Sequence, residues 1–148
     1  MRTPHVYLAA GWFNPEQKKQ MVEVYSVLSK LRDQGEIKLF APFYDGIVLK
    51  PNDPDLQAKM KEVWSLDIGK IEISDLVVAC TQGHDVGTIF ECGYASALKR
   101  TIIGYNSQPE YGLNVMLAQG AKVFVKTEKD LQKAVEDFCV VFYKGEDK

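Results

Sequence analysis

The chain has 148 residues, of which 46% are hydrophobic and 26% charged, and its formal net charge is −2. This length and composition predict a single globular domain, residues 1–148, with a substantial hydrophobic core. A net charge this close to zero provides no basic surface for nucleic acid or for an anionic membrane. No apolar run approaches the length of a membrane span. We therefore expect neither nucleic acid nor a membrane as a partner.

The cysteines and histidines are too few and too scattered for a zinc site of the usual kind. The three cysteines show no CxxC spacing, and the chain has two histidines. We expect reduced, buried thiols in a cytoplasmic protein, and no metal. A Cys-His nucleophile built from Cys80 or Cys92 with His84 remains an alternative.

Strands and helices are predicted to alternate along the first half of the chain. Asn14 and Pro15 form a helix start, with Gln17 in capping-box register, and Gly35 ends that helix. The expected elements, in order, are a strand Val6–Ala10, this helix, a strand Ile37–Ala41, a long loop Pro42–Pro54 and a helix from Asp55 to about Ile73.

The second half continues the same alternation. In order, we expect a strand Leu76–Cys80, a helix Thr88–Lys99, a strand Thr101–Tyr105, a polar loop Asn106–Gly112, a short helix Leu113–Gln119, a strand Lys122–Val125 and a helix Glu128–Val141. Such alternation predicts an α/β fold, a doubly wound parallel sheet flanked by helices. Five strands fit the flavodoxin-like order 2-1-3-4-5, in which the loops after strands one and three share a crevice.

The segment Ser74–Ala95 is the most informative part of the sequence. It places Asp85 in a loop after a buried strand and Glu91 in the helix that follows, with no Lys or Arg between them. This indicates chemistry on a neutral organic group, and a carboxylate here can attack an anomeric carbon as retaining glycosidases do. We expect the helix N-terminus to keep Glu91 ionised at neutral pH and Gly87 to leave room for a ligand. The alternative is structural: Thr88-x-x-Glu91 has the form of a capping box.

Four candidate residues, Trp12, Phe13, Asp67 and Asp85, have plain structural alternatives. Trp12 and Phe13, in a loop beside Gly11, could stack on a flat ring. Asp67 lies among apolar neighbours near the end of its helix, although an exposed charge would look the same in the sequence. Asp85 could equally be an ordinary turn residue.

Several of these motifs, taken together, resemble the nucleoside 2-deoxyribosyltransferase family. The similarity covers most of the chain, and four matching pieces occur in the family's order: Tyr7-Leu8-Ala9-Ala10-Gly11-Trp12-Phe13, the helix residue Asp67, Asp85-Val86-Gly87 through Glu91-x-Gly93-Tyr94-Ala95, and Leu113-Asn114-Val115-Met116. The resemblance implies exchange of the base of a 2′-deoxyribonucleoside through a covalent intermediate, without cofactor or metal. It also implies a homo-oligomer, a dimer-based tetramer or hexamer, with sites shared between subunits.

The resemblance assigns a role to each site residue. Glu91 would be the nucleophile, oriented by Tyr7, and Asp67 would protonate or hold the departing base. The implied substrate-binding residues are Asp85 and Asn114 for the sugar (Asn114 from the adjacent subunit), Trp12 and Phe13 for the base, Gly11 and Gly87 in the two loops, and Tyr143 near the C-terminal tail.

The sequence departs from the family at two places, and three rival functions remain. The tail ends Glu146-Asp147-Lys148 without a terminal aromatic residue, and Phe43–Asn52 lacks a base-reading glutamine. One rival is a deoxynucleoside monophosphate N-glycosidase, but AAGWFNPEQ has no Ser or Arg for a phosphate. A phosphoribohydrolase would want Gly-Gly where Asp85-Val86 stands. A flavodoxin-like binding module would want an acidic pair or a Ser/Thr-rich loop after strand one.

Overall fold

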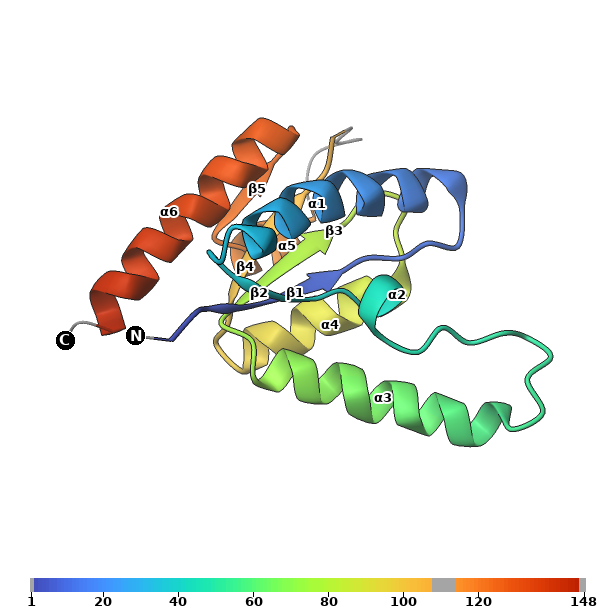
Figure 1. Ribbon diagram of the computed structural model, residues 1–148. Helices are drawn as coiled ribbons and strands as arrows, with labels where there is room; N and C mark the ends of the chain where they lie inside the picture. The colour runs from blue at the N-terminus through green and yellow to red at the C-terminus, as the bar shows by residue number, and fades with distance from the viewer. Residues whose placement is uncertain (1, 108–113, 147–148) are drawn as a thin grey trace.

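A parallel five-stranded sheet forms the centre of the protein (Figure 1). The computed structural model describes residues 2–107 and 114–146. The strands are β1 (His5–Ala9), β2 (Lys38–Phe40), β3 (Leu76–Cys80), β4 (Thr101–Tyr105) and β5 (Val123–Val125). Their order is β2-β1-β3-β4-β5, which confirms the flavodoxin-like prediction.

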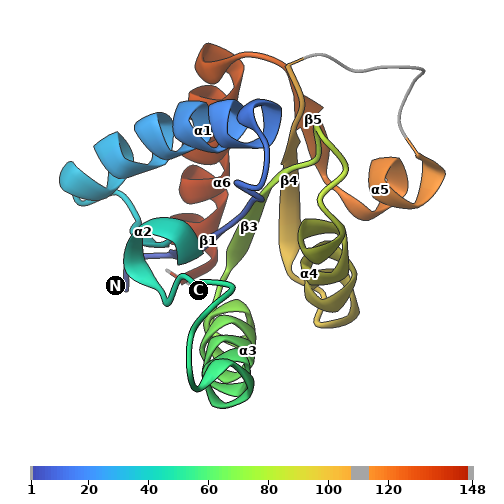
Figure 2. The same cartoon turned by 90° about the vertical axis from the view of Figure 1, so that its right-hand side faces the viewer.

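Helices cover both faces of the sheet. They are α1 (Pro15–Asp33), α2 (Pro42–Asp45), α3 (Leu56–Glu72), α4 (Val86–Ala97), α5 (Val115–Gly120) and α6 (Glu128–Glu146). α1 and α6 lie on one face, and α3, α4 and α5 lie on the other (Figures 1 and 2).

Alternation along β1 decides which side chains meet which helices. Val6 and Leu8 belong to the core under α1 and α6, and Tyr7 and Ala9 to the core under α3 and α4. All four are nearly inaccessible to solvent, because helices pack on both faces of a parallel sheet. Tyr7 therefore points toward α4 from the centre of the sheet.

The observed elements differ from the predicted ones mainly at their ends. The predicted loop Pro42–Pro54 contains α2, whose first residue is Pro42 and whose Asp45 Oδ2 accepts the Ala41 N–H at 2.9 Å. α4 begins at Val86, two residues earlier than predicted, and α6 continues to Glu146. Most of the predicted loop Asn106–Gly112, together with the predicted helix start at Leu113, lies outside the described residues.

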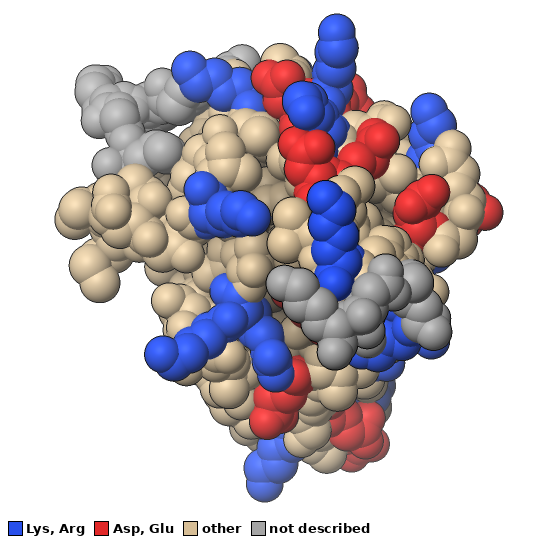
Figure 3. All heavy atoms as spheres, turned by 90° about the vertical axis from the view of Figure 1, so that its left-hand side faces the viewer, with Lys and Arg blue, Asp and Glu red and all other residues tan. Residues whose placement is uncertain are grey.

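Both ends of the described chain lie at the side where the strands begin (Figure 1). That face carries Lys and Arg side chains interspersed with Asp and Glu (Figure 3). Within residues 2–107 and 114–146, no helix has both the length and the apolar character that a membrane crossing requires.

Candidate active site

The loops that follow β1 and β3 pack directly against each other at the C-terminal edge of the sheet. A Cβ on Gly11 would lie 2.6 Å from Gln17 Oε1 and 2.7 Å from Asp85 Cγ, so a larger residue there would force Gln17 or Asp85 to move. The predicted proximity of the Trp12-Phe13 loop and the Asp85–Glu91 segment is confirmed. The strand order reverses between β1 and β3, and proteins of this fold bind ligands in the crevice at such a switch point.

Asp85, and not a capping box, caps α4. Its Oδ2 accepts hydrogen bonds from Thr88 N at 2.9 Å and from Thr88 Oγ1 at 2.8 Å. Thr88 is fully buried, and Asp85 satisfies its hydroxyl there. The capping-box alternative for Glu91 is therefore wrong. Gly87 lies beside this cap, where an added Cβ would meet Asp85 Oδ2 at 3.4 Å.

Glu91 has a tyrosine partner across the interior. Tyr7 Oη donates a hydrogen bond to Glu91 Oε2. The Tyr7 side chain is fully buried in the sheet, which fixes the position of its hydroxyl. Burial and the Glu91 charge raise the pKa of Tyr7, so the phenol stays protonated and remains a donor.

Glu91 and Asp67 are both weaker acids than usual. Burial raises the pKa of Glu91 to about 7; the hydrogen bond from Tyr7 lowers it, and the charges of Asp67 and Asp85 raise it. Burial also raises the pKa of Asp67 to about 6. The expected ionisation of Glu91 at neutral pH is thus only partial, because desolvation outweighs the helix dipole.

Aromatic side chains gather on the β1 side of the site. The Trp12 ring lies 5.2 Å from that of Phe13 and 5.3 Å from that of Phe43, measured between centroids. Phe13 is 73% exposed, so its ring is available to a ligand. Phe43 lies on α2. No sequence signal singled it out beyond its place in a loop rich in proline and aromatic residues.

The hydrogen bonds of Asn114 and Tyr143 in the described part of the chain go to other residues than Glu91. Asn114 caps α5, its Oδ1 accepting from Met116 N at 2.9 Å. Tyr143 Oη donates to the Glu36 carbonyl at 3.2 Å, next to the start of β2 and therefore at the opposite end of the sheet. A contribution of either residue to a neighbouring subunit stays a prediction.

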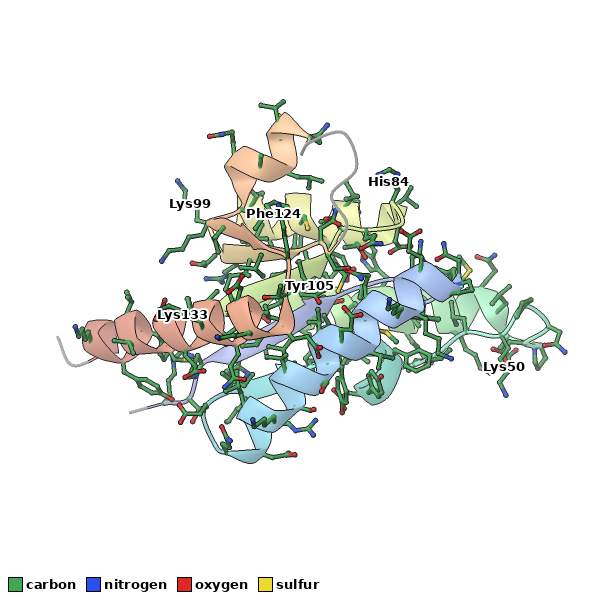
Figure 4. The ribbon with its side chains drawn as sticks, turned by 90° about the horizontal axis from the view of Figure 1, so that it is seen from above. Lys50, His84, Lys99, Tyr105, Phe124 and Lys133 are labelled. Atoms are coloured by element: carbon green, nitrogen blue, oxygen red, sulfur yellow. The ribbon has the colours of Figure 1, made fainter. Side chains whose placement is uncertain are left out.

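A cavity of about 1000 Å³ lies on the other side of α4 from Glu91 and Asp67, which with Asp85 form an acidic cluster. Its walls include Cys92 and Gly93 of α4, Leu117 of α5 and the Phe124 ring, which covers Gly104 and lies between β5 and α4 (Figure 4). Its lining does not include Tyr7, Asp67 or Glu91.

The Cys-His alternative has no geometric support. Cys80 and Cys92 are buried, and burial raises both thiol pKa values, that of Cys92 to about 12. His84 is exposed on the loop where α4 begins (Figure 4). Within the described part of the chain, no three His, Cys, Asp or Glu side chains gather as metal ligands.

The fold and this acidic cluster define a flavodoxin-like α/β protein with its carboxyl groups at the switch point. The sequence profile of the nucleoside 2-deoxyribosyltransferase family matches residues 6–140, and the chain belongs to that family. The family comprises pentosyltransferases, which transfer a pentose from one base to another, and glycosidases, which hydrolyse the bond between a pentose and its base.

Solved structures share the fold at low sequence identity. A 2-deoxyribosyltransferase from Bacillus psychrosaccharolyticus is 22% identical over 86% of this chain and 90% of its own, with a TM-score of 0.67. A conserved protein from Enterococcus faecalis V583 is 17% identical over 92% and 99%, also at 0.67. A CMP N-glycosidase from Clostridium botulinum is 20% identical over 89% and 98%, at 0.57. No curated protein sequence matches the chain.

Proposed function

We propose that this protein is a nucleoside 2-deoxyribosyltransferase, which exchanges the base of a 2′-deoxyribonucleoside for a free nucleobase. The observation that carries the proposal is the buried Tyr7–Glu91 hydrogen bond, with Asp67 close enough for its charge to raise the pKa of Glu91. This arrangement holds one carboxylate oxygen and leaves Glu91 Oε1 to react.

The reaction takes two displacements at C1′ of the sugar. Glu91 Oε1 attacks C1′, the C1′–N bond breaks, and the base leaves with the bonding electrons and a proton from Asp67. A nitrogen of the second base then attacks C1′, the C1′–O bond to Glu91 breaks, and the proton of that nitrogen returns to Asp67. Two inversions give retention. A pKa of about 6 suits Asp67 to giving and taking this proton.

The remaining candidate residues would bind either the sugar or the base of the substrate. Asp85 caps α4 through Oδ2 alone, which leaves Oδ1 for a sugar hydroxyl. Trp12 and Phe13 would stack on the base, and the backbone at Gly11 and Gly87 would approach the ligand closely. Tyr143 near the tail and Asn114 would act in a neighbouring subunit of a homo-oligomer, a dimer-based tetramer or hexamer.

The charges around the cluster favour a nucleoside over a nucleotide. Among the described residues, only Tyr7, Asp67 and Asp85 perturb the pKa of Glu91, and no Lys, Arg or His contributes. Burial alone accounts for the shift at Asp67. A phosphate placed here would meet negative charge without a cation to balance it. The buried free thiols fit a reducing compartment, and we place the protein in the cytoplasm.

The second candidate is an N-glycosidase, in which water replaces the incoming base. It is favoured by the fold shared with a CMP N-glycosidase and by the fact that water can hydrolyse the same ester intermediate.

The test is incubation of the protein with thymidine and adenine, followed by chromatography. We expect thymine and deoxyadenosine without added phosphate, and a loss of at least about a thousandfold for Glu91→Gln. Thymine without deoxyadenosine would identify a glycosidase, and an absolute need for phosphate would identify a phosphorylase. Thymidine 5′-monophosphate is the matched substrate and should react far more slowly.

A further inference from the structure

One buried side chain links the two loops that form the site. Gln17, in the first turn of α1, is 7% exposed although it is polar. Its Oε1 accepts the Phe13 N–H at 3.0 Å, and its Nε2 donates to the Gly83 carbonyl at 3.0 Å. The amide thus bonds to the loop after β1 with one atom and to the loop after β3 with the other.

The backbone around Gln17 is shaped to admit it. A Cβ on Gly83 would lie 2.7 Å from Gln17 Cγ, and one on Gly11 2.6 Å from its Oε1. Gly83 has φ +84° and the next residue, His84, has φ +51°, a conformation that side chains other than glycine adopt rarely. A turn in this unfavourable conformation persists only when neighbouring groups stabilise it. The hydrogen bond from Gln17 Nε2 to the Gly83 carbonyl is placed to stabilise this turn.

The two hydrogen bonds of Gln17, which we call the Gln17 link, involve the segments that carry the proposed ligand contacts and do not involve Glu91. Phe13 is bonded directly, and Asp85 follows the tethered Gly83 by two residues. Glu91 lies further along α4 and is held by Tyr7 from the sheet. Gln17 is therefore placed to act on substrate binding and not on the reacting carboxylate.

We propose that Gln17 is a positioning residue that sets the separation between the aromatic wall, Trp12 and Phe13, and the sugar-binding Asp85. The inference rests on the proposed function of these residues. Losing the link would leave Glu91 competent but would let the two walls move apart, so binding of the nucleoside would weaken more than the chemical step.

The first test is Gln17→Met, which keeps the length of the side chain and removes both hydrogen bonds. In the base-exchange assay we expect KM for the deoxyribonucleoside to rise about tenfold and kcat to fall less than about threefold. The matched control is Gln20→Met, one turn further on. Gln20 is 1% exposed and bonds to Ser107 beyond β4, through Nε2 at 2.6 Å and Oε1 at 3.3 Å. Equal changes in both variants would mean a general loosening of α1 and would overturn the proposal.

Gln17→Glu gives a readout that a purely structural role would not move. The new carboxylate can still accept from the Phe13 N–H. Above its pKa, however, it has no proton to donate, so one of its oxygens faces the Gly83 carbonyl oxygen without a hydrogen bond. Its protonated form can donate again. We expect kcat/KM of the wild type to exceed that of this variant about tenfold at pH 8, the ratio narrowing to within about threefold at pH 5. A ratio independent of pH would contradict the link.

Amide exchange separates this inference from the proposed function. In Gln17→Met the Phe13 N–H loses its acceptor and should exchange with solvent at least about tenfold faster, whereas it should be unchanged in Gln20→Met. If the wild type transfers no base but this exchange pattern is found, the proposed function fails and the link stands. Normal Phe13 protection in Gln17→Met removes the link.

Discussion

Glu91, the proposed nucleophile, is a weaker acid than an ordinary glutamate. Glu91 sits near Asp67 and Asp85, receives one hydrogen bond from Tyr7, and has its pKa raised by burial to about 7. As the proposed nucleophile Glu91 must be ionised, while Asp67, whose pKa is about 6, must carry the proton that it gives to the departing base. Activity should therefore pass through a maximum between about pH 6 and pH 7 and fall on both sides of it.

Removing the tyrosine hydroxyl should move that pH dependence. The hydrogen bond from Tyr7 lowers the pKa of Glu91, so Tyr7→Phe should raise that pKa further and shift the maximum of the kcat/KM profile to higher pH. We also expect about a 10- to 100-fold loss at pH 7. The matched control is Tyr105→Phe, which loses a 2.7 Å hydrogen bond to Glu23 on the opposite face of the sheet. An unmoved pH maximum in Tyr7→Phe would remove Tyr7 from the proposed mechanism.

The same carboxyl should reduce stability where it is ionised. Its folded pKa of about 7 exceeds the ordinary value of 4.5, so between these values the folded state binds more protons than the unfolded state. The free energy of unfolding therefore falls as pH rises through this range. We expect Glu91→Gln to be more stable than the wild type by about 1–3 kcal/mol at pH 8 and nearly equal to it at pH 4. Urea unfolding at both pH values measures this, and a variant less stable at pH 8 would contradict it.

At the scale of elements, the start of α4 combines a structural and a proposed binding role in Asp85. Asp85→Ala removes the N-cap and should cost about 1 kcal/mol of stability while raising KM. Asp85→Asn can still accept from Thr88 N, so it should recover stability more fully than KM.

Thr127 provides the matched control for this prediction. Its Oγ1 caps α6 by accepting from Asp130 N at 3.1 Å, away from the site. Thr127→Ala should cost similar stability with KM unchanged. If Asp85→Asn restored KM completely, the carboxylate of Asp85 would have no separate role with the sugar.

Across the whole molecule, large apolar side chains remain exposed on α3 and α4. The Trp64 and Phe90 rings lie 5.6 Å apart, more than half exposed, and Met60 and Val86 are also exposed nearby in sequence. Exposed aromatic side chains gathered in this way typically mark an interface. They support the proposed homo-oligomer, in which α5 could bring Asn114 to another subunit.

Charge placed on this surface should therefore break the oligomer. Phe90→Glu is expected to lower the mass measured by light scattering, whereas Val22→Glu, on α1 across the sheet, should not. If subunits share sites, mixing inactive Glu91→Gln with inactive Asn114→Ala should restore part of the activity. A wild-type monomer with full activity would exclude shared sites.

The sequence by itself determined the strand order and singled out the candidate carboxylates, Asp85 and Glu91. Alternating apolar strands and amphipathic helices admit few parallel topologies, and the spacing from Asp85 to Glu91 is a local pattern, so both could be recognised in one chain. The N-cap at Asn14 was likewise local, and Asn14 Oδ1 does accept from Gln17 N.

The tertiary structure decided what those residues contact. The cap of α4 went to Asp85, the pKa of Glu91 rose to about 7, and Gln17 came to bond with Gly83 from a distant loop. The Asp85 cap is a local contact with Thr88, three residues along the chain. The other two outcomes depend on desolvation or on a contact between segments far apart in the chain. Sequence patterns report local periodicity and spacing, whereas burial and long-range hydrogen bonds exist only once the sheet has assembled.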